Sequence, residues 1–250
     1  MKNKIIHLMY HDVYKCDIQE SGFIRERDLP YKIKSDVFEE QVKAISTYCQ
    51  TMNMPKESVV FTFDDGGKSF YNVIAPILEE YGYKGLFFIS TKYIGATNFL
   101  SEEEIRNLSN RGHIIGSHAH SHRHMYTLEK EDIETEWRES ITILERILGK
   151  PIYYASIPNG DKSKSVLEYA HKYGIRNIYT SDPTTEIKDF YDMKIIGRYV
   201  VLSNDTTDTV LSIISNSRVR FILSSKHLIL GVIKKLLGSN YVKLKNYIFR

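Results

Sequence analysis

The chain has 250 residues, of which 42% are hydrophobic and 26% are charged, and its formal net charge is +3 at neutral pH. This composition is ordinary for a soluble globular protein of one large domain or two small ones, and it excludes a low-complexity chain or a repeat array. The two cysteines, Cys16 and Cys49, have no metal-finger or redox spacing, so we expect no disulfide framework.

The N-terminal sequence MKNKIIHLMYHDV contains only a short apolar stretch before histidine and aspartate interrupt it. A signal peptide needs a longer apolar region, and no apolar run approaches the length of a transmembrane helix. We therefore expect a cytoplasmic protein.

Short apolar strands alternate with amphipathic helices along the chain. The pattern predicts strands at 4–11, 59–63, 86–89, 113–116, 152–156, 176–180 and 194–202. It predicts helices at 35–48, 69–81, 101–112, 129–148 and 163–173, and a further helix that begins near residue 204. Segments 12–34 and 181–192 are expected to be long loops. The alternation indicates parallel βα units, and so an α/β barrel or open sheet.

Two carboxylates follow the strand predicted at 59–63, in the sequence Thr62-Phe63-Asp64-Asp65-Gly66. In barrel-type βα proteins, reactive groups lie at the carboxyl ends of strands. Adjacent carboxylates repel each other, and a divalent metal removes the difficulty if one binds it while the other stays free as a base. An Asp-Asp-Gly turn without function is the ordinary alternative.

A second strand end carries the sequence GSHAHSHRH at residues 116–124. His118 and His122 are four residues apart, and so are His120 and His124, which is the spacing of side chains on one face of a helical turn. An extended segment would also place all four on one face. One aspartate with two histidines makes a three-ligand site that leaves an open position, as in catalytic zinc sites.

Residues 58–180 resemble the polysaccharide deacetylase family, the NodB-homology carbohydrate esterases. The family's first motif, T-F-D-D-G, stands at 62–66, and its second, two histidines four residues apart after a strand, stands at 118–122. The third motif, R-x-P-Y-G, is altered to SIPNG at 156–160. The resemblance extends to about residue 205 and implies a distorted (β/α) barrel that removes the acetyl group from an N-acetylated sugar with the help of a metal.

By matching positions, the resemblance implies that Asp65, His118 and His122 bind the metal and that Asp64 is the general base. Zinc is the expected metal, with other divalent transition metals as alternatives. His120 and His124 occupy variable positions, and we expect that replacing either leaves metal binding intact.

The altered third motif implies a substrate-binding turn at Pro158, Asn159 and Gly160, with the backbone N–H of Asn159 stabilising the oxyanion. Ser156 stands where the family has an arginine that orients the base. Arg198, on the later strand, is our candidate replacement, and an ordinary ion-paired arginine is the alternative.

The family's fifth motif, L-x-H, which provides the general acid, has no clear copy in this chain. We assign that role to His11, because the first and last strands of a closed barrel are neighbours, with His227 as the alternative. Asp182 lies roughly where the family has an acidic residue that supports the histidine, and we include it in the substrate site. A structural histidine beside Asp12 and a loop aspartate are the corresponding ordinary interpretations.

No acidic residue follows Asp208, while eight lysines and arginines do. The pattern predicts a basic amphipathic helix at 224–250, after a deacetylase barrel at 1–223. Such a helix packs on the barrel or lies on a membrane surface. Our hypothesis is the second, at the anionic inner face of the membrane. No recognised motif accompanies the charge, so we expect no nucleic-acid binding.

The sequence leaves the substrate open among a glycan, a lipid-linked precursor and a nucleotide-linked precursor. An alternative enzyme class is an amidohydrolase-type metal barrel that uses the H-x-H of His118 and His120, although such a motif belongs on a first strand. A catalytically inactive relative that binds a metal or a glycan is the second alternative.

Overall fold

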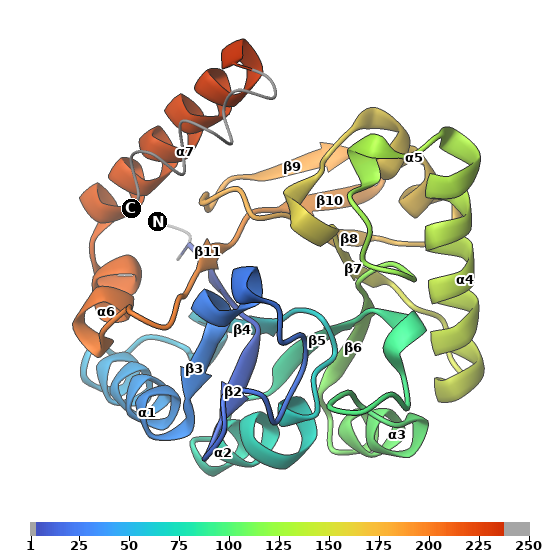
Figure 1. The fold of residues 1–250 in the computed structure, drawn as a ribbon. Helices are drawn as coiled ribbons and strands as arrows, with labels where there is room; N and C mark the ends of the chain where they lie inside the picture. Colours follow the sequence, from blue (N-terminus) through green and yellow to red (C-terminus); the bar gives the residue numbers. More distant parts are fainter. Residues whose placement is uncertain (1–3, 238–250) are drawn as a thin grey trace.

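The computed structural model describes residues 4–237. Nine strands in this range form one curled sheet in the order β11-β1-β4-β5-β6-β7-β8-β10-β9, with helices around its outside (Figure 1). These strands are β1 (Ile6–Tyr10), β4 (Val59–Phe63), β5 (Gly85–Ile89), β6 (Ile114–Ser117), β7 (Tyr154–Ser156), β8 (Asn177–Tyr179), β9 (Ile187–Phe190), β10 (Met193–Ile196) and β11 (Tyr199–Val200). The helices are α1 (Ser35–Thr51), α2 (Ala75–Glu80), α3 (Glu102–Asn110), α4 (Lys130–Leu148), α5 (Lys164–Lys172), α6 (Thr207–Ser215) and α7 (Ser217–Leu237).

The sheet is parallel except at one edge, where β9 pairs antiparallel with β10. Strands β1 and β5 are buried along their whole length, as expected when helices cover the outside of a parallel sheet and side chains fill its inside. This curled, mainly parallel sheet confirms the expected distorted α/β barrel, in the form of a half-barrel.

The predicted strand 194–202 is in fact two strands at opposite ends of the sheet. Strand β10 pairs with β8, whereas β11 pairs with β1, and only Gly197 and Arg198 separate them. A Cβ at Gly197 would lie 2.4 Å from the carbonyl oxygen of Asp182, so this close passage requires glycine. Strands β10 and β11 do not pair with each other, so the covalent link through Gly197 and Arg198 closes the half-barrel here.

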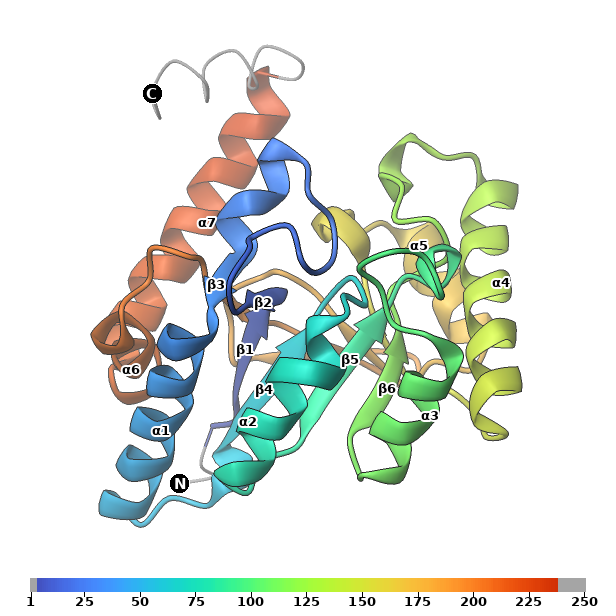
Figure 2. The ribbon, with the colours of Figure 1, turned by 60° about the horizontal axis from the view of Figure 1, so that its bottom comes forward.

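The two segments expected to be loops contain additional strands. Residues 12–34 contribute β2 (Asp12–Tyr14) and β3 (Lys32–Lys34), which form a small parallel sheet of their own. Residues 181–192 contribute β9, an edge strand whose side chains are mostly exposed and which therefore lacks the apolar alternation of a buried strand. Between β2 and β3 the chain passes over the carboxyl ends of β1 and β4 (Figure 2).

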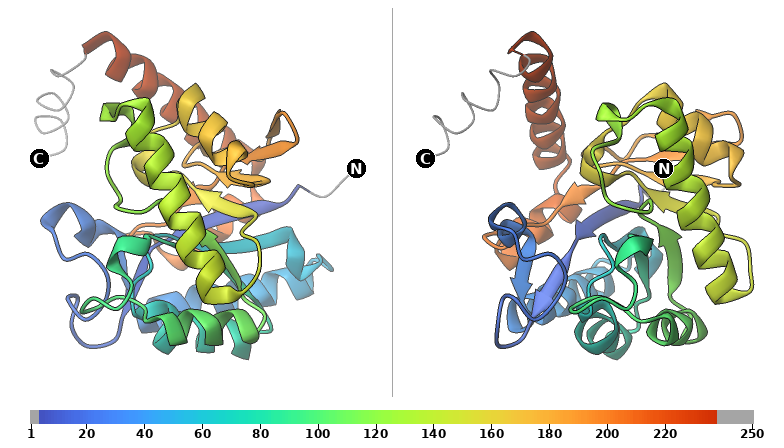
Figure 3. Two further views of the ribbon diagram at one scale, coloured as in Figure 1. Left: turned by 90° about the vertical axis from the view of Figure 1, so that its right-hand side faces the viewer. Right: turned by 45° about the vertical axis from the view of Figure 1, so that its right-hand side comes forward.

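The C-terminal helix begins earlier than the sequence indicates. Helix α7 starts at Ser217, before the expected boundary at 223, and is described as far as Leu237. The remaining part of the expected tail, 238–250, lies outside the described residues. Helix α7 follows α6 (Figure 3) and runs beside the segment after β8, where Ser224 donates a hydrogen bond to the Pro183 carbonyl oxygen and His227 pairs with Asp182. None of the helices in residues 4–237 combines the length and apolar character needed to cross a membrane.

His113, which precedes β6, is a buried histidine that should make the stability of the fold depend on pH. Its Nδ1 accepts a hydrogen bond from the Gly85 N–H at 3.0 Å, and its Nε2 lies 3.1 Å from Glu79. Burial lowers the pKa of His113 from 6.5 to about 4 despite the opposing effect of Glu79. The folded protein therefore binds fewer protons here than the unfolded chain, and this contribution to stability is lost as the pH falls from 6.5 towards 4.

We expect the difference in the free energy of unfolding between wild type and His113→Asn to become smaller as the pH falls from 6.5 towards 4. The reason is that only the wild type has to protonate or expose this imidazole. Urea unfolding at a series of pH values measures the difference. An equal difference at every pH would contradict the assignment.

Candidate active site

A pocket opens at the carboxyl ends of the parallel strands, where barrel-type folds place their reactive groups. Its volume is about 240 Å³. Side chains from the first, second and third motifs meet here with residues of the 12–32 segment. The lining includes Met9, His11, Asp12, Phe23, Asp28, Tyr31, Lys32, Asp64, Asp65, His118, His122, His124, Ile157, Asn159, Gly160, Ser181 and Arg198.

The two adjacent carboxylates separate because the backbone turns sharply after β4. Asp65 has φ 87° and Gly66 has φ 93°, both in the left-handed region. A Cβ at Gly66 would meet Ile89 at 3.1 Å, so glycine suits this position for space as well as for φ. A non-glycine residue such as Asp65 rarely adopts this conformation, and such strain is concentrated at functional sites. The turn lets Asp64 and Asp65 reach different partners.

Asp65 faces both histidines of the second motif. Its Oδ1 lies 3.4 Å from Nε2 of His118 and 3.1 Å from Nε2 of His122. One ligand atom from each of the three residues lies within 4.8 Å of the others. Asp65 Oδ1 is buried and has no hydrogen-bond partner among the described residues. Donor atoms that converge without bonding each other fit a metal ion held by one oxygen and two nitrogens.

The charge of Asp65 suits this role. Burial alone would raise the pKa of its carboxyl, but His122 and His118 outweigh it and hold the pKa well below 3.8. Asp65 is therefore ionised, as a metal ligand must be.

Asp64 turns the other way, towards Arg198. The guanidinium donates two hydrogen bonds to the carboxylate, from Nη1 to Oδ1 at 2.6 Å and from Nη2 to Oδ2 at 2.7 Å. Arg198 also donates from Nη1 to Thr62 Oγ1 and from Nε to the Thr180 carbonyl oxygen. Burial opposes ionisation of Asp64, but Arg198 and then His118 lower its pKa below the usual value. Arg198, 1% exposed, is thus a buried partner of the predicted base.

Ser156, which replaces the arginine of the third motif, connects the same groups. Its hydroxyl donates to Asp64 Oδ1 at 3.2 Å and lies 2.5 Å from Nδ1 of His118. Its carbonyl oxygen lies 3.1 Å from that nitrogen as well. These contacts favour the His118 tautomer whose Nε2 is free to face Asp65.

His11 lines the pocket directly after β1. Its ring lies 4.4 Å from that of Tyr31, measured between centroids. Burial lowers the pKa of His11, although Asp65 and Asp64 oppose the shift. Its Nδ1 is buried without a hydrogen-bond partner among the described residues, so this nitrogen is not held by the neighbouring Asp12.

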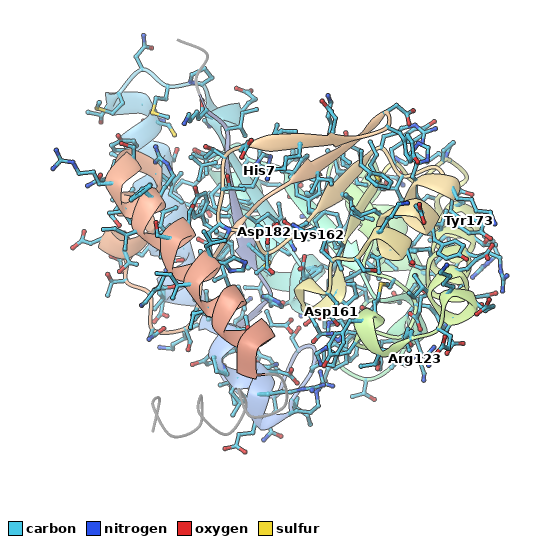
Figure 4. All side chains as sticks on the ribbon, turned by 90° about the horizontal axis from the view of Figure 1, so that it is seen from above. His7, Arg123, Asp161, Lys162, Tyr173 and Asp182 are labelled. Carbon is cyan, nitrogen blue, oxygen red and sulfur yellow. The ribbon has the colours of Figure 1, made fainter. Side chains whose placement is uncertain are left out.

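The remaining predicted site residues divide between two places. Asn159, with φ 57°, and Gly160 line the pocket, and Pro158 is buried just before them in the same turn. Asp182 lies outside the pocket, where its carboxylate pairs with Lys162 at 2.5 Å and with His227 of α7 at 3.2 Å (Figure 4). The prediction that Asp182 belongs to the substrate site is therefore not supported by the pocket lining, and His227, the alternative general acid, does not line the pocket either.

The other two histidines of the cluster differ from each other. His120 does not line the pocket, and its Nδ1 lies 3.0 Å from Thr91 Oγ1. The pair His118 and His120 of the alternative amidohydrolase interpretation therefore does not converge. His124 does line the pocket, and its Nδ1 lies 3.0 Å from the buried carboxylate of Asp161.

The buried pair Asp12 and Lys32, which are register partners in the small sheet, was not predicted from the sequence. The Asp12 carboxylate accepts hydrogen bonds from Ser21 at 2.6 Å and from Ser69 at 2.9 Å, and it lies 4.0 Å from Lys32 Nζ. Their sequence signal is weak, because each stands in a segment without periodicity. Phe23, in the same segment, packs against the His122 ring with centroids 5.1 Å apart.

One carboxylate and two imidazoles beside a buried Asp–Arg pair, at the open end of a half-barrel, are typical of metal-dependent hydrolases. Residues 51–178 match the family model of the polysaccharide deacetylases, and the chain belongs to this family. Several curated relatives are named as peptidoglycan or chitin deacetylases, in agreement with the sequence resemblance.

A peptidoglycan-N-acetylglucosamine deacetylase of Bacillus cereus is 24% identical over 174 residues, covering 64% of this chain and 62% of the relative. The chain spans about half the length of other curated relatives that it matches. The fold is similar to that of a Streptococcus pyogenes deacetylase solved with acetate, with TM-score 0.68, 20% identity and coverage of 85% of this chain and 98% of the other. A Bacillus cereus polysaccharide deacetylase gives TM-score 0.71 and 21% identity, with coverage of 85% and 69%.

Removing the cation from the buried Asp64–Arg198 pair should strongly destabilise the fold. We expect Arg198→Ala to lower the free energy of unfolding by about 3–5 kcal/mol, because it leaves a buried carboxylate without a cation. Chemical denaturation measures this loss. Arg176→Ala is the control, since its ion pair with Asp192 is largely exposed and should contribute at most about 1 kcal/mol.

The double variant Arg198→Ala/Asp64→Asn should regain part of the stability, because it also removes the buried charge. If Arg198→Ala proved as stable as the Arg176→Ala control, the Asp64–Arg198 pair would not support the fold.

Proposed function

We propose that this protein hydrolyses the N-acetyl group of an N-acetylated sugar in a glycan or glycan precursor. The observation that carries the proposal is the convergence of Asp65, His118 and His122 on one point, beside Asp64, in a member of a deacetylase family. We assign Asp65, His118 and His122 as ligands of a divalent metal, with zinc as the metal that one carboxylate and two imidazoles suit best.

A divalent metal bound there supplies Lewis acidity towards the carbonyl oxygen of the acetamide. Asp64 then takes the proton of the attacking water. Its ion pair with Arg198 fixes the orientation of the carboxylate and keeps it ionised, so that it is ready to accept that proton. Arg198 thereby takes the place of the arginine missing from the third motif.

Two further groups complete the proposed reaction. The backbone N–H of Asn159 stabilises the oxyanion, a role that does not depend on the side chain at this position. His11, which lines the same pocket, donates a proton to the departing amine nitrogen. The sugar ring lies between these groups and the wall formed by the 12–32 segment.

Substitution of each carboxylate separates the proposed roles. We expect Asp65→Asn to weaken metal binding, because it removes a charged ligand. Asp64→Asn should retain the metal but lower acetate release by about 10²–10⁴-fold, the usual contribution of a general base. Metal content of the purified protein and acetate release from chito-oligosaccharides, lipid-linked sugars and nucleotide-linked sugars are the measurements.

Full activity of Asp64→Asn would contradict the mechanism. A wild-type protein that binds metal but releases no acetate from any member of the panel would instead support the inactive relative.

We also propose that α7 holds the enzyme at an anionic membrane surface. Besides Leu230, four apolar side chains of this helix are exposed to solvent, and they form two pairs spaced seven residues apart, which places them on one face. They are Phe221 (73% exposed), Ile222 (60%), Leu228 (69%) and Ile229 (58%). Arg218 and Lys226 are also exposed on the helix, and no acidic residue follows Asp208. Apolar side chains with flanking cations suit the negatively charged cytoplasmic leaflet.

Flotation with vesicles tests this proposal. We expect the wild type to float with vesicles containing phosphatidylglycerol and much less with pure phosphatidylcholine. Phe221→Glu/Ile229→Glu should abolish flotation, because it places charges on the apolar face. The control is Ile187→Glu/Tyr191→Glu, which changes exposed apolar side chains in and beside β9. Equal flotation of both double variants would refute the role of α7, and no flotation of the wild type would refute membrane binding.

A further inference from the structure

Glu136 is a buried carboxylate on α4 that does not line the pocket. Its side chain is 4% exposed. Charged side chains are rarely buried unless they have specific partners. The partners of Glu136 all lie in the loop that contains His118 and His122.

The Glu136 carboxylate accepts hydrogen bonds from two consecutive backbone amides. Its Oε2 accepts from the N–H of His120 at 2.9 Å and of Ser121 at 2.7 Å. Its Oε1 accepts from the Ser121 hydroxyl and, at 3.3 Å, from Nε of Arg123. Arg123 lies at the rim of this loop (Figure 4) and also pairs with Asp132 of α4. One buried carboxylate thus binds three residues of the loop, two of them between the predicted ligands and one directly after His122.

This loop needs such support because its backbone is unfavourable. Ala119 and His122 both have φ 58°, in the left-handed region that residues with a Cβ rarely adopt. The opposite side of the loop is held by the segment 91–93. There the Lys92 N–H donates to the His120 carbonyl oxygen at 2.9 Å, and the Thr91 N–H donates to that of Ala119 at 3.3 Å. The loop is therefore fixed between this segment and Glu136.

The two histidines differ in how their rings are held. His118 Nδ1 lies within hydrogen-bond distance of the carbonyl oxygen and the hydroxyl of Ser156, at the end of the neighbouring strand β7. His122 Nδ1 is buried and has no hydrogen-bond partner in the part of the chain that the structure describes. The ring of His122 is in contact with Phe23, which restrains it by packing alone. Its position thus depends on the backbone that precedes it, and that backbone is held by Glu136.

We propose that Glu136 is the positioning residue of the metal-binding loop and that it sets the placement of His122. The inference rests on the proposed assignment of Asp65, His118 and His122 as metal ligands. Outer partners of metal ligands commonly act through the second ring nitrogen. In this protein a carboxylate performs that function through the backbone amides of His120 and Ser121.

The test is the affinity of the full chain for Co²⁺, measured by its visible absorption and by competition with a chelator. Glu136→Ala should weaken Co²⁺ binding by about 10–100-fold, the usual effect of losing an outer partner. It should also change the Co²⁺ spectrum, because His122 no longer occupies a fixed position. Glu136→Gln should restore most of the affinity, since its amide oxygen can accept both N–H groups.

Glu134→Ala is the matched control on the same helix, because Glu134 pairs with Lys172 at 2.6 Å and Tyr173 at 2.7 Å on the outside. It should leave Co²⁺ affinity unchanged. Glu136→Asp provides a second test if the alanine variant does not fold, because it keeps the buried charge but is too short to reach both amides. We expect it to weaken Co²⁺ binding as well.

A double-mutant cycle identifies the ligand that is affected. Once His122→Ala has removed that ligand, adding Glu136→Ala should weaken Co²⁺ binding little further. Additive effects of the two substitutions in the cycle would overturn the positioning role while leaving the metal site itself intact. The same conclusion would follow if Glu136→Ala and Glu136→Asp bound Co²⁺ as tightly as Glu134→Ala does. Failure of the wild type to bind Co²⁺ would instead refute the ligand assignment, and the positioning role with it.

Discussion

The buried ion pair between Asp64 and Arg198 connects the parts of the molecule that must meet for a site to exist. Asp64 directly follows β4, an interior strand, while Arg198 lies between β11 at one edge of the sheet and β10 next to the other edge. Their two hydrogen bonds join an interior strand to the open seam of the half-barrel. Without the guanidinium, a second buried carboxylate beside Asp65 would be strongly unfavourable.

This arrangement also explains how the third motif can lack its arginine. The guanidinium reaches Asp64 from the seam of the half-barrel, and a small serine at position 156 leaves the space open and contributes a hydroxyl to the same carboxylate. A guanidinium from the link between β10 and β11 thus contacts Asp64, although position 156 is a serine. Gly197 makes this possible, since a side chain there would meet the carbonyl oxygen of Asp182.

The features that depend on local sequence were predictable. The strand at Val59–Phe63 followed by Asp64 and Asp65, and the two histidines four residues apart, are visible as short patterns whose chemistry is specific. Arg198 could be named only as a candidate, because its contact with Asp64 spans 134 residues and depends on the closure of the sheet. The strands β2, β3 and β9 were missed, since each is short and is defined by its partner more than by its own residues.

Glu136 shows which signal a sequence does contain for such non-local contacts. Helix α4 buries an apolar stripe that includes Ile133, Trp137 and Leu144, and Glu136 is on that same buried side. A carboxylate among apolar positions conflicts with the pattern of an ordinary packed helix, and such a conflict is expected at a functional site.

The same reasoning applies to all the buried aspartate, glutamate, lysine and arginine residues of the described part of the chain. They are Asp12, Lys32, Asp64, Asp65, Glu136, Asp161 and Arg198. Five of them line the pocket, Asp161 holds a histidine that lines it, and Glu136 holds the loop behind it. Charged side chains that served only solubility would be exposed to solvent. Because these seven gather around one point, the buried charges serve the site, and the apolar packing of the helices and strands maintains the barrel around them.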